Sequence, residues 1–85
     1  MSAADLRAEV RETIFDIESQ RAQLAGVIES ARRTGHSLLS LQSYNQNVIV
    51  AGGKLINVIP TELERMLTEF AVVIQSLEDY SRETV

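Results

Sequence analysis

The sequence predicts an all-α protein that folds as an antiparallel helical hairpin or a three-helix bundle. Three observations predict it: apolar residues recur at helical spacing, both flanks are dense in charge, and residues 34–60 carry one formal charge, on Lys54. We expect helices at about 3–33, 37–58 and 61–82. A nearly uncharged middle between charged amphipathic flanks indicates a segment that is covered, either by the flanks or by another chain.

The first expected helix, 3–33, begins at a capping arrangement. Ser2, followed three residues later by Asp5, is typical of a helix N-terminus. A coiled-coil-like apolar seam follows at Leu6, Val10, Ile14, Ile17, Leu24, Ile28 and Ala31. Arg21 occupies the skipped position of this seam, so it either pairs with a carboxylate across an interface or extends to the rim along its aliphatic stem. We expect Gly35 to end the helix.

Residues 37–59 are compatible with two structures. In the first, Ser37 caps a helix. The helical seam consists of Leu41, Tyr44, Val48, Ala51, Leu55 and Val58. In the second, a β-hairpin at 47–59 turns at Gly52 and Gly53, because both of its sides are rich in β-branched residues. Two glycines cost a helix about 2 kcal/mol relative to alanine, yet the seam crosses them without a change of phase. The helix is therefore the preferred prediction, and an α+β fold is the alternative.

Pro60 lies at the start of the third expected helix, which covers about 61–82. It suits the first turn of a new helix or a kink in a helix that continues through it. Thr61 and Glu64 form a capping-box pattern, which would place Pro60 outside the helix. The apolar residues of this helix are Leu63, Met66, Leu67, Phe70, Val73, Ile74, Leu77 and Tyr80. Their spacing predicts an amphipathic helix that packs on the first one.

The composition restricts the function. The chain has 85 residues, no cysteine, one histidine and a net charge of −4 at pH 7. We expect one small helical domain over 1–85, for which oligomerisation is the available source of extra stability. The acidic charge argues against nucleic acid as a partner. Residues 34–53 are too polar for membrane insertion, and no signal peptide is visible. We expect a cytoplasmic protein, with leaderless export as the alternative.

No motif in the sequence identifies a reaction, so we expect no enzyme, no cofactor and no metal site. Gly52, Gly53 and Lys54 lack the rest of a phosphate-binding loop. Carboxylates gather on the first helix, but no Glu-x-x-His pattern accompanies them. His36 has no neighbouring carboxylate in sequence that would orient it as a base.

The leading functional hypothesis is a non-enzymatic helical interaction module. It would self-associate as a dimer or larger homo-oligomer, or dock on a larger protein, through charge-poor surface of the middle segment. The candidate interface residues are Arg21, Leu41, Tyr44, Val48, Ile49, Leu55, Ile56 and Ile59.

Two alternative functions remain open. The length, the two long helical arms, the glycine-containing bend and the lack of cysteine resemble the WXG100 class of leaderless secreted hairpins, which implies a small secretion-associated protein or chaperone. The chain has no tryptophan, and Thr34-Gly35-His36 does not supply the motif of that class. The second alternative is a small acidic inhibitor or adaptor of a larger protein.

Overall fold

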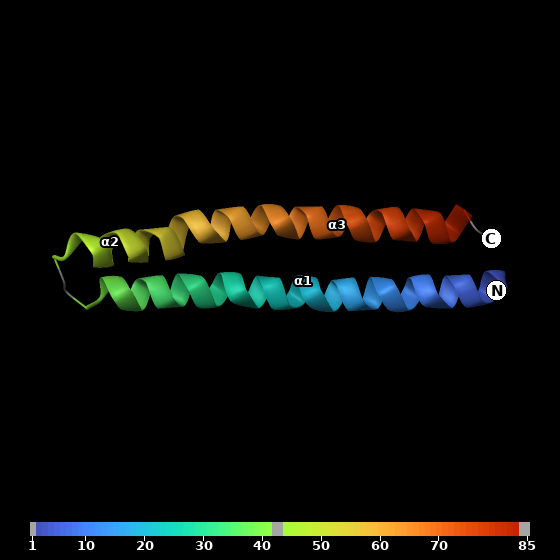
Figure 1. Cartoon of the computed structure of the whole chain (residues 1–85), viewed down its shortest axis with the longest axis horizontal. Helices are drawn as coiled ribbons and strands as arrows, with labels where there is room; N and C mark the ends of the chain where they lie inside the picture. The colour runs from blue at the N-terminus through green and yellow to red at the C-terminus, as the bar shows by residue number, and fades with distance from the viewer. Residues whose placement is uncertain (1, 42–43, 84–85) are drawn as a thin grey trace.

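The chain folds as a long helical hairpin in the computed structural model, which describes residues 2–41 and 44–83. The elements in chain order are helix α1 (Ala3–Leu39), helix α2 (Gln46–Gly53), the π-helical turn η1 (Lys54–Val58) and helix α3 (Ile59–Glu83). The last three join end to end into a second arm antiparallel to α1 (Figure 1). The molecule measures 63 × 15 × 13 Å. The predicted all-α hairpin is therefore confirmed, and the three-helix bundle is not formed.

Helix α1 begins where the sequence predicts and ends later. Ser2 forms a capping box, because its hydroxyl accepts from the Asp5 backbone N–H at 3.2 Å and its own N–H donates to the Asp5 carboxylate at 3.4 Å. The predicted stop at Gly35 is wrong, since α1 continues to Leu39. Gly35 is buried inside the helix and serves close packing of the arms instead of chain reversal.

The second arm begins at Asn45 and not at Ser37. Ser37 lies within α1, where its carbonyl accepts from the Ser40 hydroxyl at 2.8 Å, so its predicted capping role is wrong. The Asn45 side chain caps α2 by accepting from the Asn47 backbone N–H at 2.8 Å. Leu41 and Tyr44 consequently lie in the connection before α2, outside the helical seam that the sequence predicts for them.

Gly35 and Gly52 bring the two arms into close contact. A Cβ atom on Gly35 would lie 2.9 Å from the Gly52 carbonyl oxygen, and one on Gly52 would lie 2.7 Å from Leu39 Cδ2. The close packing offsets the low helix propensity of glycine. Residues 46–59 are helical throughout, so the β-hairpin alternative at 47–59 is wrong.

A π-helical turn joins α2 to α3 ahead of Pro60. The Ile59 backbone N–H donates to the Lys54 carbonyl, five residues earlier, so the turn holds one more residue than an α-helical turn. Pro60 has no N–H to donate and is fully buried in the continuing helix. Thr61 is not the predicted N-cap, because its hydroxyl donates to the Asn57 carbonyl at 2.6 Å inside the arm.

The inward side chains of the second arm differ from the predicted seam, and beyond the π turn the extra residue contributes to the difference. The predicted seam places Ala51 and Val58 inward, but both are exposed, and Gly52 and Pro60 are buried in their place. One inserted residue rotates the part of the helix that follows it by about 100°. The predicted seam therefore holds at Val48 and Leu55, which are half-buried on either side of the glycines, and is wrong at Ala51 and Val58.

The hairpin buries little apolar surface. Among the described residues, the buried aliphatic side chains are Ile28 and Ile74, with Pro60. The accessible surface is 6217 Å² and the radius of gyration is 19.0 Å. A compact protein of 9.4 kDa has about 5,000 Å² and about 12 Å respectively. The second arm thus covers one side of α1 and leaves both flanks of the pair open.

Candidate protein interface

The handedness of the helices divides the hairpin into two lateral faces. The inward row of α1 includes Val10, Ile17 and Ile28, and that of α3 includes Leu67 and Ile74; all are buried or half-buried. Each residue turns a right-handed helix by about 100°. In an antiparallel pair, a residue that comes directly after an inward residue in the sequence therefore lies on the same lateral face in both helices. A residue that comes directly before an inward residue in the sequence lies on the opposite lateral face.

The first face, which we call the arginine face, carries the cations that border the inward row. It includes Arg11, Glu18, Arg21, Glu29, Arg32, Glu64, Glu78 and Arg82. Three open grooves lie along it, and their linings confirm the geometry: Glu29 on α1 and Glu64 on α3 share one groove, and Arg11 and Glu78 share another. This face is a mixed-charge surface with small apolar recesses.

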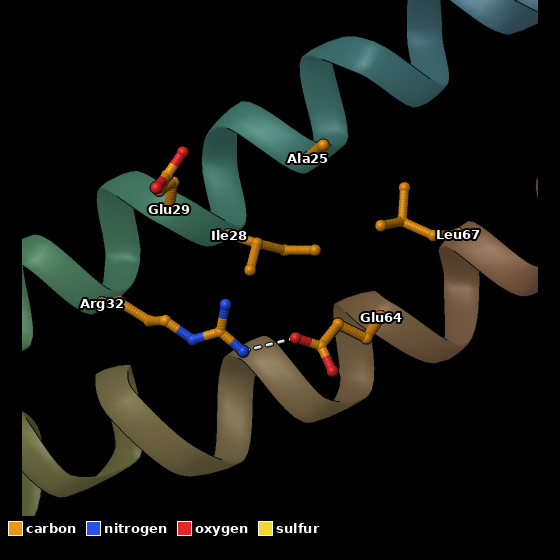
Figure 2. Close-up of a pocket in the computed structure, with 6 residues that line it drawn as sticks. All are labelled: Ala25, Ile28, Glu29, Arg32, Glu64 and Leu67. Carbon is orange, nitrogen blue, oxygen red and sulfur yellow. Dashed lines mark hydrogen bonds and ion pairs between the residues drawn. The ribbon is translucent and has the colours of Figure 1, made fainter.

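An ion pair joins the two arms across the arginine face. The Arg32 guanidinium donates to the Glu64 carboxylate in the groove that Ile28 and Leu67 also line, as Figure 2 shows. Both side chains remain about half exposed, at 45% and 50%. Arg32 is therefore engaged within the hairpin, between α1 and α3.

We expect this ion pair to contribute little stability. Solvent screens a half-exposed pair, and pairs of this kind contribute about 0.2–1 kcal/mol in double-mutant cycles. A cycle of Arg32→Gln and Glu64→Gln, measured by urea unfolding, should give a coupling in that range that shrinks as salt is added. A coupling above about 2 kcal/mol would show that the pair is as important to folding as the apolar contacts beneath it.

A second ionic cluster lies on the outside of α3 near its end. The Asp79 carboxylate accepts from the Gln75 amide at 3.0 Å and from the Arg82 guanidinium. These two hydrogen bonds, Gln75 first, and the charge of Arg82 lower the pKa of Asp79 below its usual value of 3.8. Asp79 therefore stays ionised at neutral pH and favours the last turns of α3, an effect lost as acid protonates it.

The opposite face, which we call the apolar face, carries a regular row of exposed apolar side chains. On α3 the row is Ile59, Met66, Val73 and Tyr80, one residue in every seven. Each precedes an inward position, so the row runs along one edge of the pair, and Val27 lies on the same side of α1. Met66 is 52% exposed, Val73 45% and Val27 53%. Half-buried Leu24, Phe70 and Leu77 lie between the row and the core.

The candidate residues predicted from sequence fall into separate places. Val48, Leu55 and Ile56 are half-buried, and Leu55 and Ile56 lie against the Gly35 backbone inside the hairpin. Leu41, Tyr44 and Ile49 are exposed near the connection, with Tyr44 at 97%. Arg21 is exposed on the arginine face and makes no ion pair within the described residues. Ile59 alone lies in the row of the apolar face.

Sequence reasoning missed the apolar face as a surface, although its signal was present. The seven-residue spacing of Met66, Val73 and Tyr80 is visible in the sequence. The sequence alone places all three in the packing stripe of the third helix, because the inward phase of that helix depends on the π turn and on buried Pro60.

No metal site is found in the described part of the chain, where no three His, Cys, Asp or Glu side chains are grouped to hold an ion. Within the same residues, no helix is long and apolar enough to cross a membrane. Comparisons with known proteins add no assignment: no family model, no curated protein and no solved structure matches the chain. The candidate site therefore rests on the geometry of the hairpin.

Proposed function

We propose that this protein is a non-enzymatic helical interaction module that docks on a second chain through its apolar face. The observation that carries the proposal is the exposed row Ile59, Met66, Val73 and Tyr80 beside a core with few buried side chains. Contiguous exposed apolar patches on small proteins are typical of interaction surfaces. Together with half-buried Phe70 and Leu77, the row from Met66 to Tyr80 recurs at steps of four and three residues, the spacing of a coiled-coil seam, which fits a helical partner surface.

The surface area supports a partner of ordinary size. The chain exposes 6217 Å², over a thousand Å² more than the roughly 5,000 Å² of a compact protein of its mass. A standard interface buries about 800 Å² on each partner. Covering the apolar face would therefore bring the exposed area close to that of a compact protein.

The experiment compares two neighbouring valines of α3. Val73 lies in the apolar row and Val72 lies on the back of the arm, and both are about half exposed. Val73→Glu should weaken self-association or partner retention by at least about a hundredfold, because it places an unpaired charge in the contact. Val72→Glu adds the same charge one residue away and should change self-association and partner retention by less than about threefold.

Two measurements read out this comparison. Sedimentation velocity of the purified chain reports self-association, and quantitative pull-down from the source cells reports retention of a partner. Circular dichroism checks that both variants keep the helix content of the unmodified chain. If the two variants bind equally well, the apolar face is not the docking surface.

The two alternative functions from the sequence also require a partner. For the WXG100-like alternative, Thr34-Gly35-His36 lies inside α1, and the connection at residues 40–45 contains no glycine. The resemblance therefore consists of chain length, lack of cysteine and the two helical arms. An inhibitor or adaptor would use the same apolar face against its target.

A further inference from the structure

The two lateral faces differ in the sign of their charges. The apolar face carries four carboxylates, each directly before an inward residue in the sequence: Glu9, Asp16, Glu62 and Glu69. No lysine or arginine occupies a corresponding position in the described parts of α1 and α3. The arginines that border the inward row lie instead on the arginine face. Along α1 and α3 the exposed apolar row is therefore edged by negative charge, and the nearest cation that precedes an inward residue is Lys54, in η1 at the Ile59 end of the row.

Three of these carboxylates form no ion pair within the part of the chain that the structure describes. Glu62 pairs with Arg65 on the back of α3. Among the described residues, Glu9, Asp16 and Glu69 take part in no ion pair. Two of them edge the apolar face along α1 and the third edges it along α3, so they lie on both sides of the apolar row.

A second copy of the chain fits this face poorly. Two apolar faces placed together bring no cation to Glu9, Asp16 or Glu69, so all of these charges stay unpaired at the rim. Docking the arginine face of one copy on the apolar face of the next would supply cations. That contact is head-to-tail, and it leads to rings or open chains of molecules instead of a closed dimer.

We propose that the occupant of the apolar face is a different protein: a helix or helical hairpin whose apolar seam is flanked by lysine and arginine. This inference rests on the proposed function and identifies the partner by its charge. The partner's apolar side chains cover the row from Ile59 to Tyr80. Its basic flanks lie opposite Glu9, Asp16 and Glu69, which favours this partner over acidic helices and over a second copy.

The test uses three synthetic helical peptides with one shared leucine heptad seam. Their flanking positions carry lysine and arginine in the first peptide, glutamine in the second and glutamate in the third. Binding to the full chain is measured by fluorescence anisotropy. We expect the basic peptide to bind about tenfold more tightly than the glutamine peptide, with the glutamate peptide weakest. The preference should shrink as salt rises from low to physiological concentration.

A matched pair of triple variants shows whether the preference belongs to this face. Glu9→Gln with Asp16→Asn and Glu69→Gln removes the rim carboxylates and should bring the ratio of basic to glutamine peptide to within about twofold of unity. Glu18→Gln with Glu29→Gln and Glu78→Gln removes as much charge from the arginine face and should leave the ratio unchanged. Circular dichroism confirms that both triple variants remain helical.

Each other outcome overturns a defined statement. If no peptide binds and Val73→Glu has no effect on any association, the proposed function fails as well. If all three peptides bind equally and Val73→Glu abolishes their binding, docking stands and the charge inference is wrong. If both triple variants lose the preference for the basic peptide equally, the preference comes from the net charge of the chain, and the charge inference is wrong. A closed dimer of the chain alone that excludes the basic peptide would assign the face to a second copy.

Discussion

Replacing Gly35 with alanine is expected to lower the free energy of unfolding of the hairpin by about 1–3 kcal/mol. The new Cβ would lie 2.6 Å from Ile56 Cγ1 and 2.9 Å from the Gly52 carbonyl oxygen. The Ile56 side chain can rotate away, but the carbonyl belongs to the backbone of the other arm. The two arms must therefore separate, and the packing that the glycine pair permits is lost along neighbouring turns.

Gly26 provides the matched control, because it lies in the same helix and a new Cβ there would meet no heavy atom within 4 Å apart from its chain neighbours and the adjacent backbone of its own helix. Gly26→Ala should raise the free energy of unfolding by up to about 1 kcal/mol through higher helix propensity. Both variants are compared by urea unfolding followed by far-ultraviolet circular dichroism. The same substitution is thus expected to change the free energy of unfolding in opposite directions at two positions of α1. If Gly35→Ala is as stable as Gly26→Ala, the close contact of Gly35 with the second arm is not present in solution.

The sequence predicts most of the helical hairpin because local chemistry determines those parts. The Ser2 capping box fixes the start of α1, and the apolar seam through Ile28 lies on its inward side. The end of α1 depends on a contact between segments far apart in sequence. Gly35 reads as a helix stop in isolation, but in the folded chain it faces Gly52, and the helix continues through it.

The candidate interface depends on the same long-range information. The inward phase of α3 is set by the π turn and by Pro60, neither of which alters the local spacing of apolar residues. Met66 and Val73 consequently belong to the same stripe as Leu67 and Ile74 when the sequence is considered alone. Only the position of α1 separates the residues that pack within the hairpin from those that face outward.

Replacing Ile28 with alanine should lower the free energy of unfolding by about 2–5 kcal/mol, the usual range for a buried isoleucine or leucine. Ile28 is 4% exposed and is one of two buried aliphatic side chains among the described residues. A domain of this size has a total stability of only about 5–10 kcal/mol, and the loss should lower the melting temperature by about 8–40 °C.

Val27 is the control for Ile28, because it is the preceding residue of α1 and is 53% exposed on the apolar face. Val27→Ala should change the stability of the dilute chain by less than about 0.5 kcal/mol. Its effect should instead appear in binding to the leucine-seam peptides, since an exposed side chain of this face becomes buried only in the complex. Thermal unfolding of the dilute chain and peptide anisotropy together separate the two roles. Equal destabilisation by Ile28→Ala and Val27→Ala in the dilute chain would mean that the inward row and the apolar face are assigned to the wrong sides of α1.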